Sequence, residues 1–164
     1  MKKKIRFSTV SIGSEPDKPE IPEVASFIRS HRGSEADLIT FSLAQSVTAQ
    51  KDAGIESLCA GGLFCLPRVE SALSQSTGEW QHNSSFLVSD ARMMTKLAGT
   101  VSAALPAPHL SEASPDPDNE EQYADYCDSF GDLLRDMRDA GIKSHILHTR
   151  SVEQIESERL ASKK

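Results

Sequence analysis

Residues 51–57 read Lys-Asp-Ala-Gly-Ile-Glu-Ser, and residues 138–144 repeat the pattern as Arg-Asp-Ala-Gly-Ile-Lys-Ser. In each stretch a charged pair precedes a glycine, and an apolar residue follows the glycine. Glycine adopts the left-handed backbone conformation that ends a helix, and the apolar residue then enters a sheet. The sequence therefore predicts a single α/β domain. We expect a mostly parallel sheet of about four or five short strands with helices on both faces.

The clearest helix is predicted over residues 119–140. Its apolar residues recur at the helical period and form one continuous stripe. The stripe consists of Tyr123, Tyr126, Cys127, Phe130, Leu133, Leu134 and Met137. Weaker helical patterns are present at 20–32, 44–53, 67–76 and 90–105, and Asp90 is placed to cap the start of the last of these.

Five short runs have the composition of β-strands, and they fall between the predicted helices. These runs are 4–12, 37–43, 55–59, 85–89 and 142–149. The region 37–53 also fits one long helix, because Ile39, Leu43 and Val47 lie at helical spacing. An α+β fold with 55–66 inside a helical hairpin and a mainly helical fold are therefore the alternatives.

The chain has 164 residues, of which 38% are hydrophobic and 26% charged, as in folded globular proteins. We expect one domain over 1–150 and a loosely docked tail over 151–164. No apolar run approaches the roughly 18 residues of a membrane-spanning helix. The three cysteines form no CxxC pair, and no apolar stretch typical of a signal peptide follows the first lysines. We therefore expect a cytoplasmic protein without membrane contact.

The net charge is −6, but residues 111–139 alone contain ten acidic and two basic residues. This distribution disfavours nucleic-acid binding, which needs clustered lysine and arginine. Our first hypothesis is a regulatory or protein-binding domain without catalytic activity. Acidic side chains along the predicted helix 119–140 would then attract a basic protein partner. The candidate interaction residues are Asp125, Asp128, Asp132 and Asp136.

The alternative hypothesis is a small enzyme at the carboxyl ends of the strands, where open parallel sheets place their sites. Under this assignment Cys59, Asp90 and His148 all lie at or near strand ends. A thiol, an imidazole and a carboxylate can act as nucleophile, base and orienting group. Cys59, His148 and Asp90 would fill these three roles in that order.

The same edge of the sheet is a candidate for binding an anion or a small molecule. Gly61 and Gly62 follow a predicted strand, and free glycine amides together with the Arg150 guanidinium suit a negative charge. The chain contains neither a dinucleotide-binding glycine motif nor a P-loop, so no cofactor is predicted. His145 and His148 would point to opposite faces of one strand, so no shared metal site is predicted.

Overall fold

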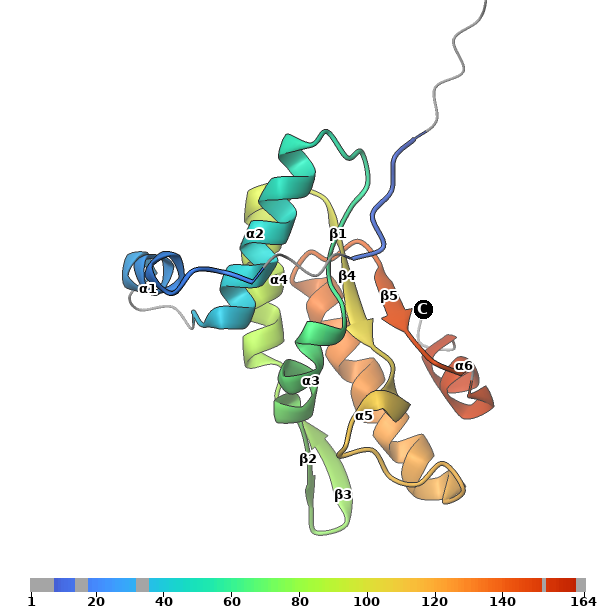
Figure 1. Ribbon diagram of the computed structural model, residues 1–164. Coiled ribbons are helices and arrows are strands. Elements are labelled where there is room, and N and C mark those ends of the chain that lie inside the picture. Colours follow the sequence, from blue (N-terminus) through green and yellow to red (C-terminus); the bar gives the residue numbers. More distant parts are fainter. Residues whose placement is uncertain (1–7, 14–17, 32–35, 152, 162–164) are drawn as a thin grey trace, which may run out of the picture.

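The computed structural model describes residues 8–13, 18–31, 36–151 and 153–161. Three strands form a parallel sheet, and two more form an antiparallel hairpin below α3 in the view of Figure 1. The helices are α1 (Ile21–Ser30), α2 (Leu38–Asp52), α3 (Leu66–Ala72), α4 (Ser85–Ala98), α5 (Glu120–Asp139) and α6 (Gln154–Ala161). The strands are β1 (Leu58–Gly61), β2 (Leu73–Ser76), β3 (Glu79–His82), β4 (Val101–Pro106) and β5 (His145–His148).

The α/β prediction is confirmed, with β4 as the central strand of the order β1-β4-β5. Ala103 of β4 is in register with Ala60 on one side and with His145 on the other. The chain moves across the sheet in one direction, from β1 to β4 to β5. Right-handed crossovers then place α4 and α5 on the same face. The packed helices consequently lie on one face of the sheet, although the sequence led us to expect both (Figure 1).

The core lies between this sheet face and the helices α2–α5. The stripe predicted on α5 is confirmed, since its aromatic, leucine and methionine side chains are buried apart from the half-buried Leu134. Each fully buried side chain of this kind stabilises the fold by about 1.5–3 kcal/mol. The α5 stripe is therefore the largest single contribution to the core.

The opposite face of the sheet is crossed by residues 8–13. Ser57 donates to the Thr9 carbonyl at 3.0 Å and accepts from the Ser11 amide at 2.9 Å. Gly13 then lies over β4, where an added Cβ would be 2.6 Å from the Ala104 Cβ. The strand predicted over 4–12 is reduced to an isolated bridge between Val10 and Ser57, and residues 1–7 lie outside the described part of the chain.

The strand predicted over 37–43 is wrong, because these residues begin α2. Asp37 caps the helix by accepting from the Thr40 amide at 3.0 Å. Leu43 and Val47 are buried at helical spacing. The alternative of one long helix over 37–53 was the correct assignment, since a short apolar run fits both periods and the cap decides between them.

The strand predicted over 85–89 is also wrong, as this run forms the first turns of α4. Asp90 does not cap the helix; it lies in the interior of α4 and is 1% exposed. The helix predicted over 90–105 ends earlier, at Gly99, which adopts a φ of 79°. Residues 101–106 instead form the central strand, whose alanines lack the β-branched composition that marks most strands.

The helix predicted over 67–76 ends at Ala72, where the chain enters the β2–β3 hairpin. This hairpin packs on α5 through Trp80, whose ring meets Tyr126 edge-on with centroids 4.7 Å apart. The tail beyond residue 150 contains α6, which docks on α5. Glu156 of α6 is 7% exposed and accepts from the Tyr123 hydroxyl and from the His109 amide.

A buried guanidinium connects α2, α3 and α4. Arg68 of α3 is 5% exposed, and its Nε donates to Asp90 at 3.0 Å. Its two terminal nitrogens donate to both oxygens of Asp37 at 2.8 Å. Thr40 donates to the other oxygen of Asp90 at 2.8 Å, and the Phe86 ring lies 4.7 Å from the guanidinium carbon. Every polar group of this cluster therefore has a partner.

Replacing Arg68 with methionine is expected to destabilise the protein by about 3–5 kcal/mol, because Asp90 would stay buried without its ion pair. Arg92→Met on the exposed side of α4 is the matched control and should cost less than about 0.5 kcal/mol. Urea unfolding followed by circular dichroism measures both values. Equal stabilities of the two variants would contradict this role of Arg68.

Candidate functional site

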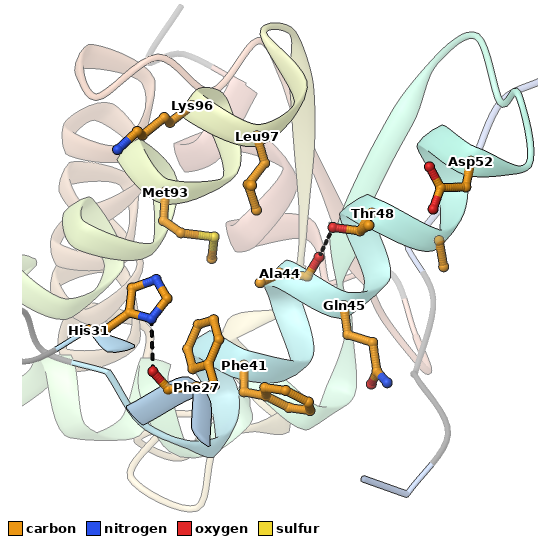
Figure 2. A pocket seen from close by; sticks show the side chains of 11 residues that line it. Phe27, His31, Phe41, Ala44, Gln45, Thr48, Asp52, Met93, Lys96 and Leu97 are labelled. Carbon is orange, nitrogen blue, oxygen red and sulfur yellow. Dashed lines mark hydrogen bonds between the residues drawn. The ribbon is translucent and has the colours of Figure 1, made fainter. Parts of the chain in front are cut away.

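A groove of about 650 Å³ lies between α1, α2 and α4 on the outer side of the helical layer. Its walls are apolar for the most part, with Phe27 from α1, Phe41 and Ala44 from α2, and Met93 and Leu97 from α4. Figure 2 shows the side chains of Phe27 and Met93 turned toward each other across the groove. Both the volume and the lining are typical of a binding site.

Aromatic contacts hold α1 against α2 at one end of the groove. The rings of Phe27 and Phe41 meet edge-on with centroids 5.3 Å apart. His31 stacks on Phe27 at 4.0 Å, and its Nδ1 lies 2.9 Å from the Phe27 carbonyl oxygen (Figure 2). Because no residue of α1 is buried, this aromatic cluster is the main attachment of α1 to the rest of the domain.

Two apolar side chains, one on α1 and one on α4, are exposed to solvent. Ile28 on α1 is 41% exposed and Leu97 on α4 is 38% exposed. Two charged side chains, Lys96 and Asp52, also line the groove. Neither of them forms an ion pair with another described residue. The groove thus combines a partly exposed apolar floor with one positive and one negative charge, and neither charge is paired within the described part of the chain.

The three residues of the predicted catalytic set lie in different environments. The side chains of a strand alternate between its faces, and Ala60 packs into the helical core, so Cys59 points to the opposite face. Asp90 lies on the helical side, bound to Arg68 and Thr40. His148 is on the face of Cys59, with its Nε2 3.2 Å from the Ile12 carbonyl oxygen. The sheet therefore separates Asp90 from the other two.

Burial also makes the thiols unreactive at neutral pH. It raises the pKa of Cys59 to about 11 and that of Cys65 to about 12, and for Cys65 the charge of Asp90 adds to the effect. Burial likewise raises the pKa of Cys127 to about 12. The thiolate is the nucleophilic form, so none of the three sites has the environment of a catalytic cysteine.

The glycines predicted to bind an anion make backbone contacts within the sheet. The Gly62 amide donates to the Ala104 carbonyl at 2.9 Å and is not free for a ligand. Gly61 has a φ of 105°, and a Cβ there would lie 2.2 Å from the same Ala104 oxygen. Close packing against β4 therefore explains why position 61 requires a glycine. Arg150, the third predicted ligand-binding residue, is exposed just beyond β5.

Three of the four predicted interaction acids on α5 have partners inside the chain. Asp128 pairs with Arg159 of α6 at 3.2 Å. Asp132 pairs with Arg135 at 3.1 Å, and Asp136 accepts from Ser84 at 2.5 Å and lies 3.3 Å from His82. Asp125 alone is classed as exposed. These three acids therefore make contacts within the fold. Fewer negative charges on α5 are then available to a partner than the sequence led us to expect.

Sequence reasoning missed the groove for a definite reason. Its floor is formed where α2 and α4 lie side by side, and the first turns of both helices had been assigned to strands. The signal was present, because Phe41 and Ala44 lie at helical spacing on a different side of α2 from the buried Leu43 and Val47. A consistent helical assignment of 37–53 would have exposed this second apolar stripe.

No protein-family model, no curated protein and no solved structure matches this chain. Within the described ranges, none of the helices has the length and apolar character needed to cross a membrane. The geometry of the described residues is therefore the basis for any functional proposal.

Alanine substitutions at the two glycines will distinguish packing from ligand binding. Both Gly61 and Gly62 have positive φ, so each change strains the backbone by about 1–2 kcal/mol. Only Gly61→Ala also drives a Cβ into the Ala104 carbonyl, and overpacking adds about 1–3 kcal/mol. We expect Gly61→Ala to be the less stable variant in urea unfolding. The reverse order would mean that the loop after β1 is not packed as described.

Thiol labelling tests the assignment of the cysteines as structural. At pH 7.5 the native protein should react with a chromogenic disulfide reagent far more slowly than the urea-unfolded protein. The labelling rate of Cys59 should rise about tenfold per pH unit until the pH approaches its pKa of about 11. Rapid labelling of Cys59 in the native state at pH 7.5 would restore the nucleophilic hypothesis.

Proposed function

We propose that this protein is a binding domain without catalytic activity, and that the groove between α1, α2 and α4 holds an amphipathic helix of a partner protein. The observation that carries the proposal is the uncovered apolar floor built from Phe27, Phe41, Met93 and Leu97. Globular proteins expose single apolar residues freely, but a contiguous apolar patch commonly marks a binding surface. A regulatory role would follow from the occupancy of this groove.

The shape of the groove favours a helix as its occupant. Two helices and a third at the end bound a channel that is open to solvent, as in helix-in-groove recognition. A partner helix with apolar residues at positions i, i+3, i+4 and i+7 would contact both α2 and α4. It would also cover Ile28 on the α1 rim, which the fold leaves exposed.

The charges at the groove determine which charged residues we expect on the partner helix. Beside its apolar stripe, the partner helix would have an acidic residue that pairs with Lys96 and a basic residue that pairs with Asp52. Both groups are exposed, so their contribution to affinity is small, but like charges at these places would be unfavourable. This requirement differs from the basic partner expected for the acidic face of the helix 119–140, because the partner helix would have charges of both signs.

The enzyme alternative has less support. The predicted catalytic residues are divided between the two faces of the sheet, and burial suppresses thiol reactivity. The acidic face of α5 is weaker as a docking surface, because three of its four acids are held by contacts within the chain. The groove has neither drawback, and this is why we prefer it.

The proposal is tested with a displayed library of amphipathic helices whose apolar stripe and flanking charges are randomised. Selection on the wild-type protein should enrich sequences with apolar residues at i, i+3 or i+4, and i+7. Binding of the selected peptides, measured by fluorescence anisotropy, should weaken at least about tenfold in Leu97→Glu, because a charge would enter the apolar floor.

Leu63→Glu is the matched control, since Leu63 is also an exposed leucine but lies outside the groove. It should bind the selected peptides as the wild type does. Circular dichroism of both variants confirms that they are folded. The proposal is wrong if selection on the wild-type protein enriches no sequence more strongly than selection on Leu97→Glu does. It is also wrong if both glutamate variants weaken peptide binding equally.

A further inference from the structure

A second hollow, of about 330 Å³, lies between α5, the edge strand β5 and α6, and it shares no residue with the groove. Three cationic side chains line it: Arg135 and Arg138 from the last turns of α5, and Lys143 from the segment that leads to β5. Neighbouring positive side chains repel each other, and an anion that lies between them removes this repulsion. Their gathering around one hollow therefore calls for a negatively charged group.

Internal acids neutralise only part of this charge. Arg135 pairs with Asp132 at 3.1 Å, whereas Arg138 and Lys143 form no ion pair with any residue in the described ranges. Cations often follow a helix to offset its exposed carbonyl groups. Here the Gly141 and Ile142 amides already donate to the carbonyls of Arg138 and Met137. The two free cations are thus not required to satisfy the end of α5.

The inner wall of the hollow contains His145 and Ser144. The Nε2 atom of His145 is buried and has no hydrogen-bond partner among the described residues. Burial lowers the pKa of His145 to about 4, and the positive charge of Arg138 contributes to this decrease. The ring is consequently neutral at pH 7, and its sensitivity to Arg138 makes it a reporter of any anion that neutralises this arginine.

The rest of the lining is apolar. Leu134 of α5, Leu147 of β5 and Leu160 of α6 face the same space as the cations. An inorganic ion would contact only the cations and would leave these leucines without a partner. A ligand with both an anionic group and an apolar group would satisfy the two kinds of wall.

We propose that this hollow binds a small organic phosphate monoester. Its phosphate would lie between Arg138 and Lys143, and its apolar group would lie against Leu134, Leu147 and Leu160. Phosphate is favoured over carboxylate because its two negative charges match the two cations Arg138 and Lys143, and the arginine fork can bind its oxygens in bidentate contact. This site is separate from the helix-binding groove, so either proposal can fail without the other.

Phenyl phosphate is the probe, with the full-length protein at pH 7.5 and moderate salt. Calorimetry should detect saturable binding, and the ring signals of His145 should shift during an NMR titration. Inorganic phosphate, which lacks the apolar group, and phenylacetate, which has a single charge, should each bind at least about fivefold more weakly. Equal affinity for phenylacetate or for inorganic phosphate would overturn the assigned ligand class.

Arg138→Gln and Lys143→Gln should each weaken phenyl phosphate binding about tenfold, as expected for the loss of a charged hydrogen bond. Arg92→Gln removes a cation from the exposed side of α4 and should leave the affinity unchanged. All three positions are exposed, so the variants should fold. The proposal fails if phenyl phosphate does not bind, if it binds without shifting His145, or if Arg92→Gln weakens binding as much as the other two.

Discussion

The buried guanidinium of Arg68 determines how the helices are arranged. It is held by the carboxylates of Asp37 and Asp90, and burial raises the pKa of Asp90 even though Arg68 and Thr40 favour its charged form. A buried charge that loses its partner costs several kcal/mol, so α3 is constrained to lie against the start of α2 and the interior of α4. The ion pairs of Arg68 thus connect α3 to α2 and α4, the two helices that pack side by side under the groove.

The small residues of β4 set the second constraint. Ala103 and Ala104 are buried on opposite faces of the central strand, one under the helices and one under Gly13. Because both faces are covered at short range, the strand ends offer little room for a ligand near Gly61. The groove lies outside α2 and α4, and the cationic hollow lies beside the edge strand β5. Both of our proposals are therefore located away from the carboxyl edge of the sheet, where parallel sheets commonly bind their ligands.

The two hollows differ in the way their polar groups are satisfied. The groove has an aromatic and aliphatic floor with isolated charges at its rim, and this suits a large apolar partner that excludes water. The hollow beside β5 has free cations next to leucines, and this suits a small anionic ligand. Two acidic residues of α5 are used in contacts within the fold, since Asp128 pairs with α6 and Asp136 lies beside His82 of the β2–β3 hairpin.

The sequence by itself determined the elements whose apolar residues follow one period over a long stretch. The stripe of α5, the junctions at Gly54 and Gly141, and therefore the α/β class could all be inferred from local pattern, because a helix end and a long amphipathic face are local properties. Short runs were not determined in this way. Residues 37–43 and 85–89 are too short for their period to decide between strand and helix; in the fold both begin helices, and Asp37 and Asp90 of these helices bind Arg68. The candidate sites were decided by tertiary structure alone, because the groove and the cationic hollow each combine side chains from at least three elements that the chain brings together only on folding.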